Sequence, residues 1–354
     1  MTGPGETRLL ALLVHHGFLT RQQAEDALRS GDPVTHLVSA GVCSREEWER
    51  WRRTEAGTRP ELTRYEVRDV LGQGGTARVF RALDRKSNEV VALKVLLPSL
   101  TTNRAAVQRF VTESKLLIEL QHDAIVRGLR VAREGETVFC AMQLVPGECL
   151  QDRLARGEVL GEDEALRIVV QVAGALAYLH GRGLVHRDVK PGNVMWDAEA
   201  GRAVLIDLGF AARRAEGQSH GAGSPDETTV GTVHYISPEQ ARGAAELDVR
   251  ADIYSLGATL YHLVTGSLPF EGASGEEVVA KQVLQDLSSD KFRALHLSPQ
   301  IHYFIEKMMA KEKEIRFQTP QDLAQEVSAY LQSLEHREPE REPKGRRRRR
   351  RPLF

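Results

Sequence analysis

Residues 186–193 read His-Arg-Asp-Val-Lys-Pro-Gly-Asn, and residues 207–209 read Asp-Leu-Gly. Transfer of a phosphoryl group to a hydroxyl needs a carboxylate beside the incoming hydroxyl and hard oxygen ligands for magnesium. Asp188 fits the first role, and Asn193 with Asp207 fits the second. A His-Arg-Asp triplet alone also occurs by chance on solvated loops, so the weight rests on the spacing of the two motifs. That spacing predicts a phosphoryl-transfer site that binds Mg²⁺.

With these motifs the chain resembles the Ser/Thr protein kinases, in the form widespread among bacteria, from about Tyr65 to about Leu334. The resemblance implies an α+β fold of two lobes, with an antiparallel sheet in the small lobe and a mostly helical large lobe. It also implies ATP as the phosphate donor and protein hydroxyl groups as acceptors. Lys190 matches the family lysine that neutralises the γ-phosphate, and it points to Ser/Thr rather than Tyr specificity.

Residues 71–80 read as two strands joined by a glycine turn. Glycines let the backbone approach phosphates because they carry no Cβ. Lys94 follows in an alternating apolar run, where a strand would point it into the cleft beneath this turn. A lysine in such a place is often only a surface residue with a buried stem. The resemblance instead implies that Lys94 contacts the nucleotide phosphates, together with Leu71, Gly72 and Gly74.

The rest of the nucleotide site is expected from three further segments. Helical spacing predicts a helix over residues 107–120. By resemblance, Glu113 in this helix matches the family glutamate that pairs with the lysine; the alternative is a glutamate on a solvated helix face. Residues 138–145 form an apolar strand that should lead into the hinge. By resemblance, the adenine pocket is formed by Val79, Ala92, Met142 as the gatekeeper, Leu144 and Met195. A plain core role is compatible with each of these apolar positions.

Regulation by phosphate is expected at the residues after the metal motif. Arg187 precedes the catalytic aspartate and, in the family, marks kinases whose activation loop is ordered by phosphate. Thr228 and Thr229 match the phosphosites of similar kinases, and a phosphate there could pair with Arg187. The alternative is that both threonines are ordinary loop residues. The hydroxyl of Thr232 is expected to bridge the catalytic aspartate and lysine.

Two expectations concern the scaffold of the large lobe. Glu239 matches the glutamate that closes the activation segment, and Arg316 matches the arginine that pairs with it. Asp252 matches the buried helix aspartate that braces the catalytic loop.

Three positions depart from the family pattern. Ala77 replaces the third glycine of the phosphate loop, Leu208 replaces the commoner Phe, and Ser237 replaces Ala. No ionisable catalytic group is lost, so we expect an active enzyme rather than a pseudokinase that serves as a signalling scaffold. A small-molecule kinase of the same fold is disfavoured because residues 228–239 resemble a protein-substrate platform.

Composition sets the cellular context. The chain has 354 residues, of which 41% are hydrophobic, enough for a full core. Its longest apolar runs fall far short of the ~18 residues of a membrane span, so we expect a cytoplasmic protein without a transmembrane segment. The three cysteines, Cys43, Cys140 and Cys149, show no metal-binding spacing.

Residues 1–60 predict a small helical module with an internal near-repeat, in which residues 13–23 align with residues 37–47. Each copy has a glycine suited to a helix C′ position, Gly17 or Gly41, followed by a capping-box pattern. The module is either a packing extension of the small lobe or a site for a protein partner. The kinase domain is expected over residues 65–334.

Residues 335–354 are expected to be a disordered charged tail, because this composition cannot bury a core. Residues 346–351 are all arginine. Without the seven basic residues Lys344 and Arg346–Arg351, the formal net charge of −1 becomes −8. The rest of the chain is therefore acidic, although the whole chain is nearly neutral. The tail could bind anionic lipid or nucleic acid, or contact its own acidic body.

Overall fold

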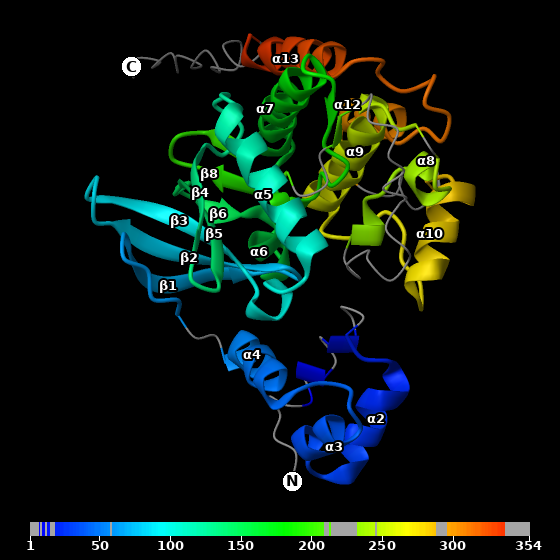
Figure 1. The fold of residues 1–354 in the computed structure, drawn as a ribbon. Helices are drawn as coiled ribbons and strands as arrows, with labels where there is room; N and C mark the ends of the chain where they lie inside the picture. Colours follow the sequence, from blue (N-terminus) through cyan, green and yellow to red (C-terminus); the bar gives the residue numbers. More distant parts are fainter. Residues whose placement is uncertain are drawn as a thin grey trace, which may run out of the picture.

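The computed structural model describes residues 7, 9–10, 13–14, 18–56, 59–208, 212–213, 232–244, 246–287 and 296–336. Within these residues the chain forms a small helical module, a lobe built on a β-sheet and a larger helical lobe (Figure 1). The predicted α+β, two-lobed fold class is therefore confirmed. None of the helices within the described ranges is long and apolar enough to cross a membrane.

The N-terminal module contains α2 (Arg21–Ser30), α3 (Pro33–Ser39) and α4 (Arg45–Ala56). Both predicted capping boxes are present: Thr20 and Gln23 cap α2, and Ser44 and Glu47 exchange hydrogen bonds of 2.7 and 3.1 Å at the start of α4. Gly41 has φ +67°, the left-handed conformation expected of it. The corresponding Gly17 lies outside the described residues.

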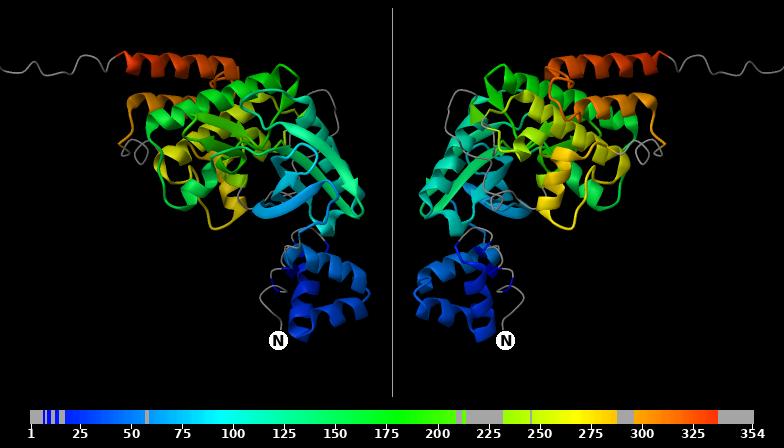
Figure 2. Two further views of the ribbon diagram at one scale, coloured as in Figure 1. Left: turned by 90° about the vertical axis from the view of Figure 1, so that its left-hand side faces the viewer. Right: turned by 90° about the vertical axis from the view of Figure 1, so that its right-hand side faces the viewer.

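The module has an apolar core of its own that also contacts the small lobe. Its centre holds Trp48 and Trp51, with ring centroids 6.4 Å apart. Phe18 packs against this core and, at the same time, against a small-lobe cluster that includes Leu97 and Phe110. The module lies directly beside the small lobe in two views (Figure 2). The structure therefore shows the module packed on the small lobe, while a role in partner binding stays a prediction.

The small lobe is a five-stranded antiparallel sheet in the order β1-β2-β3-β5-β4. Its strands are β1 (Tyr65–Gln73), β2 (Ala77–Asp84), β3 (Glu89–Leu96), β4 (Gly128–Glu134) and β5 (Thr137–Gln143). After β3 the chain passes through the 3₁₀ turn η1 (Pro98–Leu100) into α5 (Arg104–Glu119), whose N-cap is Asn103. Phe110 and Leu117 of α5 are buried, which fixes the helix that carries Glu113 to the lobe.

The large lobe is organised around two long helices, α7 (Glu162–His180) and α9 (Val249–Thr265). Most residues of α9 are buried, including its polar residues Asp252, Ser255 and Thr259, so the helix is a central support rather than a surface element. Around it lie α6 (Leu150–Ala155), α8 (Pro238–Ala241), α10 (Gly275–Leu284), α12 (Pro299–Met308) and α13 (Pro320–Glu335). Helix α13 includes Glu335, the first residue of the predicted tail.

Short strands line the junction between the lobes. They are β6 (Glu148–Cys149), β7 (Leu184–Val185), β8 (Val194–Asp197), β9 (Arg202–Leu205) and β10 (Ala212–Arg213). Strands β6, β8 and β9 form one sheet, and β7 pairs with β10. The 3₁₀ turn η2 (Pro191–Asn193) between β7 and β8 carries part of the segment that opens the sequence analysis.

Candidate active site

The strand register of the small lobe brings the predicted nucleotide-binding residues to one face of the sheet. Val79 of β2 lies opposite Lys94 of β3, and Ala92, two residues before Lys94, lies opposite Met142 of β5. Side chains two apart on a strand, and those of directly paired residues, share a face of the sheet. These four side chains therefore point the same way, and Ala92, Met142 and Val79 belong to the hydrophobic cluster of the large lobe.

The remaining pocket residues approach from the hinge, the second lobe and the glycine turn. Leu144 follows β5 and packs against the same cluster. Met195 of β8 pairs with Cys149 of β6. Leu71 and Gly72 lie at the end of β1, and the turn is closed by a 2.9 Å hydrogen bond from the Gly74 amide to the Ala77 carbonyl. Gly72 pairs with Val79 across β1 and β2, so the glycine turn adjoins the strand that carries one of the apolar pocket residues.

Lys94 connects the two lobes through Asp207. Its Nζ lies 2.8 Å from Asp207 Oδ1, and the lysine side chain is largely buried. The pKa of the Lys94 ammonium is affected most by burial, which lowers it, but the charges of Asp207 and Glu113 outweigh this and leave the pKa raised. The cation is therefore held in its charged form, as a phosphate contact requires.

The expected ion pair of Lys94 with Glu113 is not formed within the part of the chain that the structure describes, where Lys94 pairs with Asp207 instead. Burial raises the pKa of Glu113 to about 7, against a smaller lowering by the nearby Lys94 charge. The physical reason for the difference is the position of α5, which holds the Glu113 carboxyl beyond ion-pair distance of Lys94, and burial without that ion pair leaves the pKa of Glu113 raised.

The catalytic loop holds Asp188 at one oxygen and leaves the other without a protein partner. Asp188 Oδ2 accepts a hydrogen bond from Asn193 Nδ2 at 2.9 Å and lies 2.9 Å from Lys190 Nζ. Asp188 Oδ1 is buried and has no hydrogen-bond partner among the described residues. Burial raises the pKa of Asp188, while Lys190 and Asn193 oppose that rise. The two oxygens of this carboxylate thus differ: Oδ2 is held by two side chains, and Oδ1 is buried without a hydrogen-bond donor among the described residues.

Asp252 of α9 braces this loop from below. Its two oxygens accept hydrogen bonds from the backbone amides of His186 at 2.8 Å and Arg187 at 2.7 Å. Arg187 has φ +69°, an uncommon conformation for a residue with a side chain. Two charge-assisted hydrogen bonds donated by these amides to a fully buried carboxylate can hold this backbone in place.

The side chain of Arg187, a cationic residue of the same loop, has an unsatisfied hydrogen-bond donor among the described residues. Its Nε is buried and has no hydrogen-bond partner within the described part of the chain, and burial lowers the pKa of its guanidinium. Thr228 and Thr229 lie outside the described residues, and of Thr232 the structure describes the backbone only. Their predicted roles stay predictions.

Asn193 and Asp207 are adjacent through the backbone. The Ile206 amide donates a 3.0 Å hydrogen bond to the Asn193 carbonyl, so Asp207 follows directly beside Asn193. The Asn193 amide nitrogen donates to the Asp188 carbonyl at 2.7 Å as well as to the Asp188 carboxylate. Asn193 Oδ1 and the Asp207 carboxylate, which also contacts Lys94, are hard oxygen atoms of the kind that Mg²⁺ prefers.

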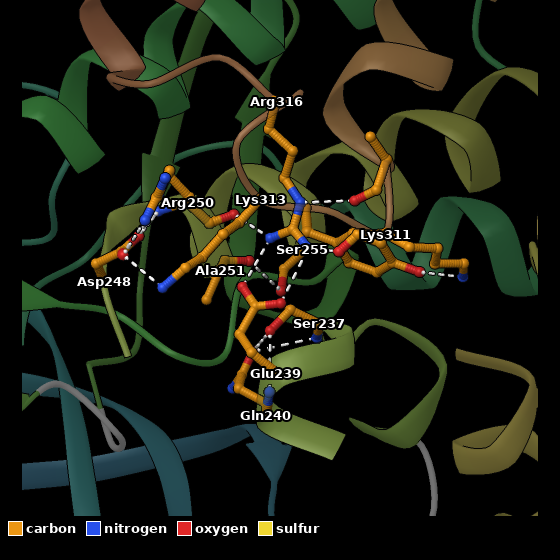
Figure 3. A network of polar contacts seen from close by, with 12 residues as sticks. Ser237, Glu239, Gln240, Asp248, Arg250, Ala251, Ser255, Lys311, Lys313 and Arg316 are labelled. Atoms are coloured by element: carbon orange, nitrogen blue, oxygen red, sulfur yellow. Dashed lines mark hydrogen bonds and ion pairs between the residues drawn. The ribbon is translucent and has the colours of Figure 1, made fainter. Parts of the chain in front are cut away.

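Arg316 and Glu239 form a buried bidentate ion pair (Figure 3). Arg316 Nη1 and Nη2 lie 2.7 and 2.9 Å from the two oxygens of Glu239. The guanidinium also donates to the carbonyls of Ala310, Arg250 and Lys311, so each of its five N–H donors has an acceptor. The pair fixes α8, which follows the activation segment, to the large lobe.

Two residues that the sequence analysis did not single out complete this region. Gln240 Nε2 donates a 2.9 Å hydrogen bond to the Arg187 carbonyl, and its Oε1 accepts from the Ser237 amide in a capping box of α8. The Ser-x-x-Gln spacing is a recognisable signal for this box. Ser237, one of the departures from the family pattern, is fully buried at the N-cap. Gln282 of α10 gave no such signal and is treated below.

Comparison with known proteins agrees with this geometry. The model of the family described as "Protein kinase domain" matches residues 65–328. The chain belongs to the protein kinase family. The kinase match covers both lobes and leaves the N-terminal module outside it.

Several curated bacterial kinases are similar to this one. It is 34% identical to serine/threonine-protein kinase PknB of Mycobacterium tuberculosis over 285 residues, which are 79% of this chain and 44% of that protein. It is 37% identical to serine/threonine-protein kinase pkn3 of Myxococcus xanthus over 227 residues, 63% of this chain and 41% of that protein. A probable serine/threonine-protein kinase of Clostridium perfringens is 33% identical over 260 residues, 73% of this chain and 37% of that protein. The kinase thus spans less than half the length of these relatives.

Proposed function

We propose that the chain is a Ser/Thr protein kinase that transfers the γ-phosphate of ATP to protein hydroxyl groups. The observation that carries this proposal is the bonding of Asp188, whose Oδ2 is held by Lys190 and Asn193 while the buried Oδ1 has no partner in the described structure. A carboxylate held in this way can accept the proton of an incoming hydroxyl at Oδ1.

The surrounding residues take separate parts of the transfer. Lys190, beside Asp188, neutralises negative charge on the phosphate in flight. Asn193 and Asp207 are the residues that would hold Mg²⁺, which would supply positive charge to neutralise the phosphates. Lys94 binds the phosphates of ATP, and its present contact with Asp207 keeps both groups at the junction of the lobes.

The adenine base is assigned to the apolar face that includes Ala92, Val79 and Met142. Met142 is buried on the strand that leads to the hinge, in the place of a gatekeeper. The glycine turn over residues 72–75 would cover the phosphates with backbone amides. Because these groups approach from different elements, closure of the two lobes on MgATP would complete the site.

Phosphate on Thr228 or Thr229 is the proposed activating modification. It is supported by Arg187, whose buried Nε lacks an acceptor among the residues described. A phosphate oxygen would provide a charged acceptor and order the segment against the catalytic loop. Phosphopeptide mapping after incubation with MgATP checks the assignment. Undiminished activity of a Thr228→Ala, Thr229→Ala double variant would leave it without support.

The proposed setting is the cytoplasm, since the three cysteines are all free thiols and a kinase needs a supply of ATP. Protein substrates are the proposed partners. A further protein partner for the N-terminal module, and anionic lipid or nucleic acid for the arginine run, are proposed from the sequence alone.

A signalling scaffold without catalysis is the competing function, and two variants distinguish it. Lys94→Met and Asp188→Asn should each nearly abolish phosphate transfer, because one removes a phosphate ligand and the other the proton acceptor. Only the Asp188→Asn variant should keep its affinity for ATP, measured by calorimetry. Full turnover in either variant would contradict the assigned roles, and a wild-type chain that binds ATP without turnover would favour the scaffold.

A further inference from the structure

The turn that follows the activation segment is held by one buried amide. Gln282 of α10 donates from Nε2 to the carbonyl oxygens of His234 at 2.8 Å and Val233 at 3.3 Å, both in the 3₁₀ turn η3 (Thr232–His234). Its Oε1 accepts a hydrogen bond from Tyr254 Oη at 2.6 Å. Gln282 is fully buried, so water cannot readily replace it. Both donors of the amide are therefore spent on successive carbonyls of one turn.

A second layer of side chains orients that amide. Tyr254, fully buried on α9, receives a hydrogen bond at Oη from Lys311 Nζ at 3.2 Å. Lys311 Nζ also donates to the backbone carbonyl of Gln282 at 2.9 Å. The Arg316 guanidinium lies 5.0 Å from the centre of the Tyr254 ring. The turn is thus connected through α9 and α10 to the ion pair of Arg316 with Glu239.

Other side chains hold the residues that follow the turn. The hydrogen bonds of Gln282 therefore act on the turn and not on the whole segment. Tyr235 Oη lies 2.7 Å from His262 Nδ1, and Glu239 is fixed by Arg316. At the turn itself, the other side-chain hydrogen bond among the described residues joins His234 Nδ1 and the Phe270 carbonyl at 3.1 Å. Figure 1 shows α10 beside α8, on the side of the large lobe where the activation segment ends.

We propose that Gln282 is a positioning residue for the protein substrate. By fixing the carbonyls of Val233 and His234, it sets the path of the backbone along which the acceptor segment approaches Asp188. The inference rests on the proposed function, and it takes residues 233–239, the described part of the segment whose sequence resembles a protein-substrate platform, as the surface that binds the acceptor. Among the described residues, the side chain of Gln282 bonds only to the turn and to Tyr254, and neither is assigned to ATP or Mg²⁺, so its action falls on the acceptor protein.

The test uses the full chain and a matched substitution. Gln282→Met keeps an unbranched side chain of similar length but removes the amide. Tyr254→Phe removes only the hydroxyl that orients it. Gln285→Met places the same change at the exposed end of α10. With casein as acceptor, we expect KM for casein to rise about tenfold in Gln282→Met, the effect of losing about one well-made buried hydrogen bond. The rise should be smaller in Tyr254→Phe and absent in Gln285→Met, with KM for ATP changed less than about twofold.

Hydrogen exchange gives a readout that does not need catalysis. The backbone amides of residues 233–237 should exchange at least about tenfold faster in Gln282→Met than in Gln285→Met, while amides of α7 stay protected. Identical exchange and identical KM for casein in the two variants would overturn the proposal. So would a parallel loss of ATP affinity and of protection in α7, which would indicate a structural role only. A wild-type chain that never phosphorylates casein would count against the proposed kinase function, while the exchange result would still decide the role of Gln282.

Discussion

Replacing Arg316 by Met should destabilise the large lobe more than any change at a surface ion pair. The Arg316 side chain is fully buried, and Glu239 is 13% exposed. The substitution leaves the Glu239 carboxylate without its cation and removes the donor from three backbone carbonyls. Loss of one partner of a buried pair costs about 3–5 kcal/mol. For a domain of this size that corresponds to a fall in Tm of roughly 6–15 °C.

The assay is thermal unfolding followed by circular dichroism, with two comparisons. Lys313→Met is the matched control, because Lys313 forms a 3.4 Å ion pair with Asp248 at a more exposed position, worth less than about 1 kcal/mol. Glu239→Gln combined with Arg316→Met completes a double-mutant cycle. The double variant should lose less stability than the two single variants together, since it no longer buries an unpaired charge. A Tm for Arg316→Met within about 2 °C of the wild type, or no different from Lys313→Met, would refute the reasoning.

Three other outcomes are expected, the first two from the structure and the third from the sequence of the tail. In the folded state the pKa of Glu113 is about 7, above its ordinary 4.5. Between these two pH values the folded state binds more protons than the unfolded state. The free energy of unfolding should therefore fall by up to about 3 kcal/mol as pH rises from 4.5 to 7. In urea titrations at several pH values, Glu113→Gln should not show this fall. If the free energy of unfolding of the variant depends on pH as strongly as that of the wild type, the prediction is contradicted. Phe18→Ala should loosen the module and raise proteolytic cleavage between module and small lobe, whereas Val90→Ala, at an exposed position, should not. Deletion of residues 344–354 should remove any salt-sensitive binding to anionic vesicles or nucleic acid without lowering turnover on a small peptide; equal binding with and without the tail would exclude this role.

Much of the site could be predicted because short motifs specify both chemistry and local structure. The spacing of the two motifs predicts that Asp188, Asn193 and Asp207 share one site, and the structure brings them together through the Asn193–Asp188 hydrogen bond and the hydrogen bond from the Ile206 amide to the Asn193 carbonyl. The capping boxes of the module could also be predicted from the sequence, because each one needs only two residues that are three positions apart.

The rest depended on contacts between elements distant in sequence. Lys94 forms its ion pair with Asp207 and not with Glu113 because of the position of α5 against the sheet. No local sequence pattern specifies that position. Gln282 is an ordinary residue of an amphipathic helix until α10 packs beside the turn at Val233. Long-range packing decides such contacts, and sequence periodicity shows only that a residue faces inward.

The most direct measurement of the central claim is residue-level mass spectrometry of phosphate transfer. Wild-type chain is incubated with MgATP and with the Asp188→Asn chain, which serves as an acceptor that cannot catalyse. The kinase assignment predicts phosphoserine or phosphothreonine on the acceptor when wild-type chain is present, and none when Asp188→Asn is incubated alone. Phosphate confined to tyrosine would contradict the assigned specificity, and its absence from every residue, with ATP binding intact, would contradict catalysis itself.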